Sequence, residues 1–599
     1  MNKTNTIIFS LAIALCAVAI LLPNRYALTV FHEANSAGRV YAIHSYVHYG
    51  TWSLAPVLCR TGPKHSIVDM AAKDGVPYLQ KAPGNSWFGI PVYALISKIA
   101  GGIRLPFHWT AMILGLLTVG LPLVGAGFVL FRRWGASIGQ RAAALAVITM
   151  LLASPIHTYS GMFQDYPLAV AFLMLGWALA SGGFVFALLA GLLLGTAGVT
   201  NYAFFVYGFV VALIEWGRRL IQGDHPWRFA LTWAAGFSVP LGALLIYNTV
   251  LFGGPFTTAY SFLIDAGQRH TSSNLGFSFE ALKRTLVGSR HGIFTTAPWT
   301  IIGVIGLIHA LSKKHLQWTA ITGFGVIFAV LGFATIWGRS NVDDMAFHRH
   351  ILAVFPWLAW GFAYAIASLM KSGSALGRGI VGFGAAGLVV GWFVNLATSW
   401  TFPYHDFRLP SPIWQLNVPL LFSEAHLPSI VGYLFSPWHI PGRSTAGAHW
   451  SPIMVSIVAA GLAFALIAIG HGTPTRLQPT PRTAKALQKR RMRPWAFTAS
   501  FMASLFLLFG LGIISCPVSS ETLQWARTVT PEQRDRLDPE TREAYELAKM
   551  ENREFDSAYT DIVGSSFTPQ DVFWKEDGYP ETNRWCDVTD LRRPIPKTQ

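Results

Sequence analysis

Side chains able to perform acid–base or metal chemistry are scarce in most of this sequence. Only 12 of its 29 Asp and Glu residues lie outside the stretch 521–590. Carboxylates act as general acids and bases and bind hard divalent cations, so any acid–base or metal chemistry by carboxylates must draw on this small set. Two of the twelve, Glu215 and Asp224, lie beside Arg-rich segments. The other ten are Glu33, Asp69, Asp74, Asp165, Asp265, Glu280, Asp343, Asp344, Asp406 and Glu424.

Thirteen long apolar segments separate these carboxylates. The hydrocarbon core of a bilayer is about 30 Å thick, and a helix needs roughly 20 apolar residues to cross it. The sequence therefore predicts an all-α polytopic membrane protein with thirteen transmembrane helices. The expected spans cover residues 6–22, 108–131, 139–155, 166–182, 184–199, 202–216, 229–252, 298–311, 316–336, 350–369, 379–400, 451–470 and 495–515.

Lys and Arg residues between these segments set the predicted orientation, because short basic loops stay in the cytoplasm. A cytoplasmic N-terminus places every basic loop on the cytoplasmic side and the C-terminus on the outer side. The ten carboxylates then face the outer side, where we expect any chemistry. The basic loops contain Arg132-Arg133, Arg218-Arg219, Lys313-Lys314, Lys371 and Lys489-Arg490-Arg491.

The predicted organisation has two parts. Residues 1–515 form the transmembrane domain, which includes a long first outer loop at 23–107. Within that loop, residues 86–100 are apolar but short and contain Pro91, so we expect a helix that lies in the membrane interface. Residues 516–599 form a polar extracytoplasmic tail with helical capping signals, typical of a lid or docking module.

Composition excludes several functional classes. The mean hydropathy is +0.42, and 52% of the residues are hydrophobic. The net charge of +16 is largely loop charge that sets orientation, and no basic run with interleaved aromatics indicates nucleic-acid binding. The four Cys residues form no CxxC pair, so Cys ligation of a metal is not predicted; one disulfide among Cys59, Cys516 and Cys586 stays open. The pairs His44/His48 and His348/His350 lack a third ligand, so no metal site is assigned.

Several short motifs fall at the predicted outer ends of the helices. They are Lys81-Ala82-Pro83-Gly84 followed by Trp87, Arg104-Leu105-Pro106, Gly161-Met162-Phe163-Gln164-Asp165-Tyr166-Pro167, Tyr247-Asn248 with Gly253-Gly254-Pro255, Arg290-His291-Gly292-Ile293-Phe294, and Phe347-His348-Arg349-His350. In this order and placement, they resemble the GT-C superfamily of membrane glycosyltransferases. The most similar branch comprises the protein mannosyltransferases and aminoarabinose transferases. The resemblance covers roughly residues 1–370.

The sequence departs from that branch at one position. Its members commonly carry an acidic pair just after the first helix, where this chain has Asn35-Ser36, with Glu33 two residues earlier. Asp69, about a dozen residues before Lys81, is the best substitute. Gln80 also stands where related bacterial sequences have Asp.

The resemblance implies transfer of a sugar from a polyprenyl-phosphate carrier to a lipid, polysaccharide or protein acceptor at the outer face. We expect Asp69 to act as general base, Asp165 as a second acidic residue that orients the acceptor or a metal, and Glu33 as a further candidate. Lys81 and Arg349, together with Arg290 and His348, are expected on the donor phosphate, because Arg and Lys match phosphate oxygens. A divalent cation, Mg²⁺ or Mn²⁺, is compatible with this chemistry, although no metal ligands are assigned.

Other interpretations remain open at this point. Asp165 could be a helix-end residue in contact with water, Lys81 could extend to lipid headgroups, and Arg349 could anchor a helix at the interface. A secondary transporter would share the topology, but the two halves show no repeat and the spans carry almost no charge in mid-membrane. A non-catalytic scaffold is favoured by the neutral residues Asn35-Ser36 and Gln80.

Overall fold

The computed structural model describes eleven segments of the chain and one isolated residue near its C-terminus. Outside these segments lie Glu33, Asp69, Arg290 and His348, nearly all of the polar tail, and two of the three cysteines considered for a disulfide, Cys516 and Cys586. The described residues are 3–23, 34–61, 70–99, 107–263, 276–288, 292–337, 349–372, 374–401, 411–422, 450–469, 494–514 and 533.

Each of the thirteen predicted apolar segments coincides with a helix. The second forms one continuous helical path through α5 (Phe107–Leu114), the π-helix η2 (Gly115–Gly120) and α6 (Leu121–Ile138). The others are α1 (Lys3–Leu21), α7 (Gln140–Leu152), α9 (Asp165–Ala180), α10 (Phe184–Thr200), α11 (Ala203–Gln222), α12 (Pro226–Phe252), α16 (Thr300–Leu311), α17 (Gln317–Trp337), α18 (Phe355–Ser372), α19 (Ala375–Trp400), α22 (Trp450–Ile469) and α24 (Pro494–Ile514).

Six helical segments in the described part are long and apolar enough to span a membrane, and shorter apolar helices accompany them. The chain is therefore a multi-pass membrane protein, and the all-α prediction is confirmed; the count of thirteen spans stays a prediction. Several helices extend beyond the apolar stretch into the basic loops, so that Arg132 and Arg133 belong to α6 and Arg218 and Arg219 to α11. The six segments are Thr4–Leu21, Thr110–Ile138, Pro226–Phe252, Gln317–Ile336, Arg349–Ser372 and Ala375–Trp400.

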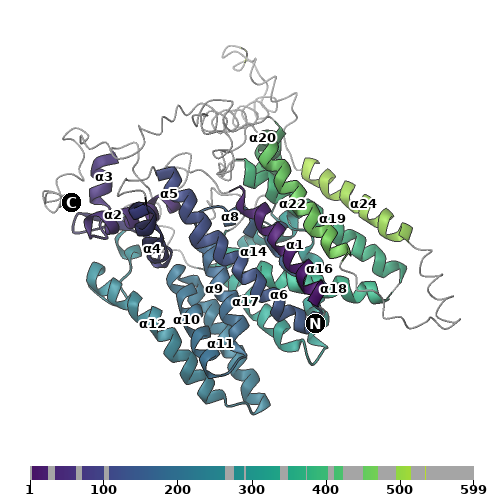
Figure 1. Ribbon diagram of the computed structural model, residues 1–599, viewed down its shortest axis with the longest axis horizontal. Coiled ribbons are helices and arrows are strands. Elements are labelled where there is room, and N and C mark those ends of the chain that lie inside the picture. The colour runs from purple at the N-terminus through teal and green to yellow at the C-terminus, as the bar shows by residue number, and fades with distance from the viewer. Residues whose placement is uncertain are drawn as a thin grey trace.

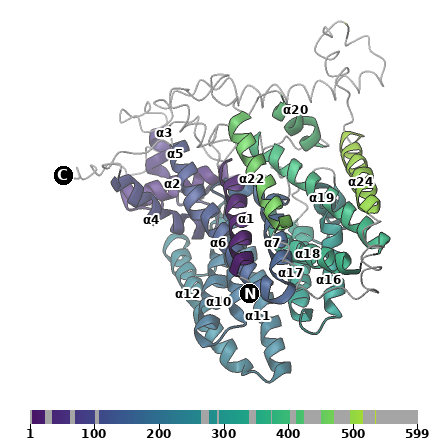
Figure 2. The same ribbon diagram turned by 45° about the vertical axis from the view of Figure 1, so that its right-hand side comes forward.

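The helices form one bundle, shown in Figure 1, with α10, α11 and α12 at one edge and α19 and α24 at another. Figure 2 shows α1 beside α22, and α24 along α19, so the last helices of the chain return to pack on earlier ones. Small residues allow the closest approaches. A Cβ atom at Gly306 of α16 would overlap the carbonyl oxygen of Gly361 on α18, so the two backbones touch there, as is common between membrane helices.

The hydrogen bonds of α1 show how the two ends of the bundle are assembled. The Gln140 side-chain amide donates to the Thr6 hydroxyl at 2.8 Å, near the start of α1. The Ser160 hydroxyl, at the end of the short helix α8 (Ile156–Ser160), donates to the Ile20 carbonyl at 3.4 Å, near the other end of α1. The helices α1 and α7 are therefore parallel neighbours, as the predicted alternation of loops requires of the first and third spans.

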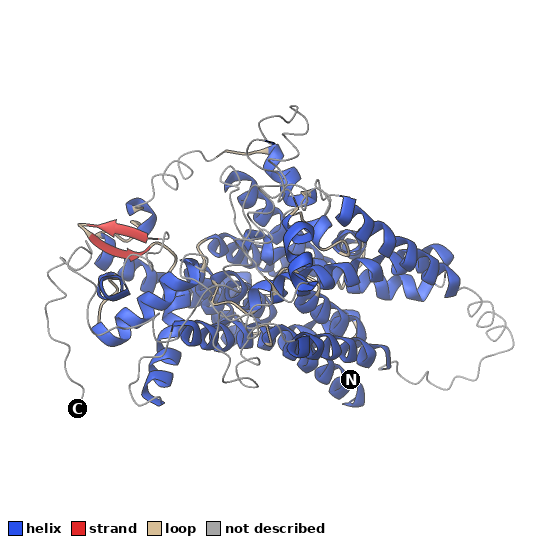
Figure 3. Ribbon diagram, turned by 90° about the horizontal axis from the view of Figure 1, so that it is seen from above, coloured by secondary structure: helices blue, strands red, loops and turns tan. Residues whose placement is uncertain are grey.

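The first predicted outer loop folds into a small unit of its own. It contains α2 (Ala34–Tyr49), α3 (Ala55–Thr61), a hairpin of β1 (Met70–Lys73) and β2 (Val76–Leu79), and α4 (Gly84–Ile99). The hairpin lies at the periphery of the molecule (Figure 3). Asp74 and Gly75 form its two-residue turn with positive φ angles of 53° and 79°, as a type I′ turn demands. The helix expected at 86–100 is confirmed as α4, which packs against α2 and α10.

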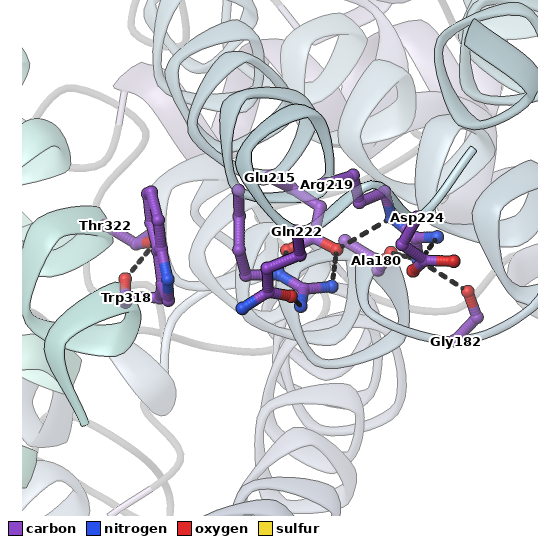
Figure 4. A network of polar contacts seen from close by, with 9 residues as sticks. Ala180, Gly182, Glu215, Arg219, Gln222, Asp224, Trp318 and Thr322 are labelled. Atoms are coloured by element: carbon purple, nitrogen blue, oxygen red, sulfur yellow. Dashed lines mark hydrogen bonds and ion pairs between the residues drawn. The ribbon is translucent and has the colours of Figure 1, made fainter. Parts of the chain in front are cut away.

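At the opposite end of the bundle from Asp165, Arg219 joins three elements (Figure 4). Its guanidinium donates to the carbonyl of Ala180, the last residue of α9, at 3.1 Å and to that of Gly182, in the turn that follows, at 2.7 Å. It also pairs with Glu215 and Asp224, each at 3.0 Å. Arg side chains stabilise the exposed carbonyls of a helix C-terminus. This contact fixes α9 relative to α11, and the other ends of these helices carry the candidate site.

Shorter helical elements connect the long ones. They are η3 (Ala259–Phe262), α14 (Phe279–Val287), α15 (Ile293–Thr296), η5 (Arg349–Val354), η6 (Ile413–Asn417) and α20 (Val418–Phe422).

Candidate functional site

Asp165 is the best-defined candidate residue in the structure. It begins α9 and is only 5% exposed. One carboxylate oxygen, Oδ1, lies 2.9 Å from Nη2 of Arg39, and the other, Oδ2, accepts a hydrogen bond from Nδ2 of Asn201 at 2.8 Å. A carboxylate in the first turn of a helix is also stabilised by the helix dipole. The charge of Asp165 is therefore compensated from three sides.

Arg39 comes from α2 and is completely buried. Its Nη1 donates to the backbone carbonyl of Asn35 at 2.8 Å, one turn earlier in the same helix, which fixes the guanidinium toward α9. A buried charge requires a partner, because an isolated ion in a region of low dielectric constant is strongly destabilising. Arg39 is not among the predicted site residues. One feature of the sequence could have indicated it: Arg39 follows Asn35 by one helical turn, so a cation stands on the segment where the resembled family carries acids.

Asn201 lies in the short turn between α10 and α11. Its Oδ1 accepts from the backbone N–H of Ala203 at 3.2 Å, so the side chain caps the first turn of α11 while its Nδ2 group holds Asp165. Sequence reasoning placed no function here, because a lone Asn between two apolar helices has no distinctive spacing. The Asp165 carboxylate, on α9, is thus bound by residues from α2 and from the turn before α11.

Neutral side chains occupy the position of the missing acidic pair. Asn35 and Ser36 are buried, and the Ser36 hydroxyl donates to the Phe163 carbonyl at 3.2 Å. This bond joins the start of α2 to the segment that leads into Asp165. At the two positions where the resembled family commonly carries acids, this chain thus has a neutral pair, and Ser36 makes a structural hydrogen bond.

The Lys81 element is anchored close to Asn201. Lys81 is half-buried and lies two residues after the end of β2 and two residues before Pro83, which precedes the start of α4 at Gly84. A Cβ atom at Gly84 would lie 2.7 Å from the backbone nitrogen of Thr200, so only glycine permits this approach to the end of α10. The segment that carries Lys81 is thereby held at the same end of the bundle as Asp165.

Arg349 approaches the site from the opposite side, through Tyr166. The Arg349 guanidinium carbon lies 6.0 Å from the centroid of the Tyr166 ring, within the range of a cation–π contact. The Tyr166 hydroxyl and Nδ1 of His350 share a hydrogen bond of 2.5 Å. Because Tyr166 directly follows Asp165, the structure brings Asp165 and Arg349 to one region.

Four predicted site residues lie outside the described part of the chain. Three of them lie next to a described residue: Glu33 precedes Ala34 at the start of α2, Asp69 precedes Met70 in β1, and His348 precedes Arg349. Met70 pairs with Leu79, two residues before Lys81. The assignments of Asp69, Glu33, Arg290 and His348 therefore remain predictions.

The two histidines of α2 contact one tyrosine. His44 Nδ1 lies 2.7 Å and His48 Nε2 lies 3.1 Å from the Tyr93 hydroxyl on α4. This arrangement joins α2 to α4 near the candidate site. Among the residues that the structure describes, no group of three or more His, Cys, Asp and Glu side chains is arranged to hold a metal ion. The suggested Mg²⁺ or Mn²⁺ stays an untested expectation.

No protein-family model matches the sequence, and no curated protein is similar to it in sequence. Solved structures are similar to it at low identity. ArnT from Cupriavidus metallidurans bound to undecaprenyl phosphate is 15% identical with a TM-score of 0.45, over 93% of this chain and 89% of that one. The Archaeoglobus fulgidus oligosaccharyltransferase in its apo form is 12% identical with a TM-score of 0.40, over 68% of this chain and 57% of that one.

The arabinosyltransferase EmbB from Mycobacterium smegmatis is 11% identical with a TM-score of 0.34, over 87% of this chain and 42% of that one. All three are GT-C glycosyltransferases, the superfamily that the sequence motifs resemble. With TM-scores below 0.5, these similarities carry none of the functional argument.

Proposed function

We propose that this protein is a membrane glycosyltransferase that moves a sugar from a polyprenyl-phosphate donor to an acceptor hydroxyl at the outer face of the bacterial inner membrane. The observation that carries the proposal is the set of charged groups at one end of the bundle. A buried carboxylate, Asp165, lies there with Arg349 beside the adjacent Tyr166, and the segment carrying Lys81 is anchored next to Asn201. Ionisable groups at such positions in a membrane protein are functional candidates.

The proposed reaction needs two kinds of group. The acceptor oxygen attacks the anomeric carbon of the sugar, the bond from that carbon to the phosphate oxygen breaks, and the acceptor proton passes to a base. Lys81 and Arg349 supply the positive charge that stabilises the departing phosphate, and this stabilisation is greatest where the cations are held in place before reaction. We assign proton acceptance to Asp69, because the Asp165 carboxylate is engaged by Arg39 and Asn201.

Asp165 then has an orienting role. Each of its oxygens already has one partner in this structure, Arg39 or Asn201. A paired carboxylate can still hold an acceptor hydroxyl through the remaining lone pairs of its oxygens. If a divalent cation takes part in the reaction, Asp165 and Asp69 are the carboxylates that we would assign to it.

A non-catalytic scaffold is the second candidate, and one observation favours it. The neutral Asn35-Ser36 pair and the compensation of Asp165 by Arg39 leave the described side of the site without a free carboxylate. A secondary transporter has no comparable observation in its favour. Both alternatives predict that donor and acceptor leave the protein chemically unchanged.

Lipid extraction from the purified protein tests the proposal at the level of binding. We expect mass spectrometry of the extract to find a polyprenyl phosphate in excess over its share of the membrane, and the Lys81→Ala variant to reduce that excess. The Lys283→Ala variant is the matched control, because Lys283 is an exposed lysine on α14. An extract that contains bulk phospholipid alone would contradict the proposal.

A further inference from the structure

Three buried polar side chains beside Asp165 have no hydrogen-bond partner. Asn85, Ser86 and Gln164 are all fully buried, and none of their side-chain polar atoms is bonded. These atoms are Oδ1 and Nδ2 of Asn85, Oγ of Ser86, and Oε1 and Nε2 of Gln164. Buried polar groups in proteins are almost always paired, and an unpaired one calls for a bound molecule or a functional reason. Three such side chains close together indicate a binding site more strongly than a single one does.

Helix periodicity and contacts place the three side chains in one neighbourhood. Asn85 precedes Gly89 by one turn on α4, so both lie on the same face of this helix. A Cβ atom at Gly89 would meet Ile43 of α2 and lie 3.2 Å from the Phe163 ring. Phe163 immediately precedes Gln164, and its carbonyl accepts from Ser36. The polar start of α4 therefore faces the α2 and 163–164 segments.

The same stretch of α4 also reaches the partners of Asp165. Gly84, next to Asn85, is in contact with the backbone of Thr200, and Thr200 adjoins Asn201, which binds Asp165. Gln164 adjoins Asp165 in the chain. Asn85, Ser86 and Gln164 thus border the Arg39–Asp165–Asn201 cluster, and none of the three carries a charge.

The chemistry of these groups indicates what they would bind. Amide and hydroxyl groups both donate and accept hydrogen bonds, as the hydroxyls of a sugar do. The Arg39–Asp165 pair next to them is neutral in sum, so it neither attracts a cationic amino sugar nor favours an anionic one. We propose that Asn85, Ser86 and Gln164 form the subsite that recognises the hydroxyls of an uncharged donor sugar. This inference rests on the proposed glycosyltransferase function and names the class of its substrate.

Access to this subsite requires movement. The three side chains are covered in the structure, so the sugar reaches them only when α4 separates from the 163–164 segment. The contacts between α4 and α2 that would change are those of Gly89 with Ile43 and of Tyr93 with His44 and His48. Binding of the sugar then closes α4 on it and satisfies the unpaired amides.

Binding of three lipids to the detergent-solubilised full-length protein tests the inference: undecaprenyl phosphate, undecaprenyl phosphate mannose, and the same carrier with 4-amino-4-deoxyarabinose. We expect the wild type to bind the mannosyl lipid about tenfold more tightly than the bare carrier, the scale of one or two extra hydrogen bonds. We also expect it to bind the mannosyl lipid more tightly than the aminoarabinosyl lipid. Gln164→Leu and Asn85→Leu should each remove most of the preference over the bare carrier.

A stability measurement separates recognition from a structural role. Leu at these positions replaces unpaired polar atoms with apolar ones, so we expect the apparent melting temperature to stay the same or rise. Asn395→Leu is the matched control: Asn395 is a buried amide on α19 whose groups are bonded to the Gly391 carbonyl and to Thr158. It should lower the melting temperature and leave the mannosyl preference intact.

The possible outcomes separate this inference from the proposed function. If the wild type binds undecaprenyl phosphate but does not prefer its mannosyl form, the subsite is refuted while lipid-phosphate binding stands. A preference for the aminoarabinosyl lipid would also refute it. An unchanged mannosyl preference in both Gln164→Leu and Asn85→Leu, with lowered melting temperatures, would show that the amides serve the fold. Failure of the wild type to bind any of the three lipids would overturn the proposed function as well.

Discussion

Nη2 of Arg39 lies 2.9 Å from Oδ1 of Asp165, and both side chains are withdrawn from solvent. This ion pair joins α2, from the predicted outer loop, to the first turn of α9. The pair therefore couples the loop unit to the helical bundle at the point where we place the reaction. Loss of one partner of such a buried pair lowers the free energy of unfolding strongly, whereas replacement of both partners by apolar residues changes it little.

Arg39→Met tests that coupling. It leaves the Asp165 carboxylate buried with Asn201 alone, and we expect a loss of about 3–5 kcal/mol in the free energy of unfolding. The double variant Arg39→Met/Asp165→Leu should recover most of this loss. Arg284→Met is the control, because the Arg284–Glu280 pair is exposed and such pairs contribute only about 0.5 kcal/mol. Equal apparent melting temperatures for Arg39→Met and the wild type would contradict the buried pair.

Arg219→Met tests the contact at the far end of α9. Its guanidinium bonds two carbonyls and two carboxylates, so we expect its loss to destabilise the protein by about 2–4 kcal/mol. Arg218→Met is the matched control: Arg218 is more exposed and shares Glu215 but makes no contact with α9 that the structure shows, so its removal should cost less than about 1 kcal/mol. Similar melting temperatures for the two variants would show that Arg219 does not hold α9.

Lys81→Ala should weaken donor binding with little effect on the fold. Lys81 is half-buried and is assigned to the donor phosphate, so we expect the apparent KM for a polyprenyl-phosphate sugar to rise about tenfold, the scale of one charge-assisted hydrogen bond. Lys283→Ala, which removes an exposed lysine from α14, should leave this KM unchanged. An unaltered KM in Lys81→Ala would remove this residue from the donor site.

The helices were predictable because each carries its own signal. A long apolar run bounded by charges specifies a membrane helix without reference to the rest of the chain, and all thirteen runs coincide with helices. Asp74-Gly75 is an equally local turn signal, but the hairpin that this turn closes was not predicted. Two short strands show too little alternation of apolar and polar residues to be recognised among predicted helices.

The site was only partly predictable, because its contacts join distant segments. Asp165 and the Lys81 element were identified by spacing and resemblance. The pairing of Asp165 with Arg39 depends on how α2 packs on α9. The two residues are far apart in the sequence, so no local pattern predicts that they meet. The unpaired amides of Asn85 and Gln164 could not be predicted either. Only the packing of the folded chain determines which polar side chains have a hydrogen-bond partner.

The most direct test of the proposed function is sugar transfer by the purified protein in liposomes. With a polyprenyl-phosphate sugar donor and outer-membrane lipid, polysaccharide or peptide acceptors, we predict transfer by the wild type. We predict that Asp165→Asn, which keeps the shape of the side chain, lowers the rate by about 100-fold or more when equal amounts of folded protein are compared. Equal rates for the wild type and Asp165→Asn, or return of every donor unchanged by the wild type, would contradict the account.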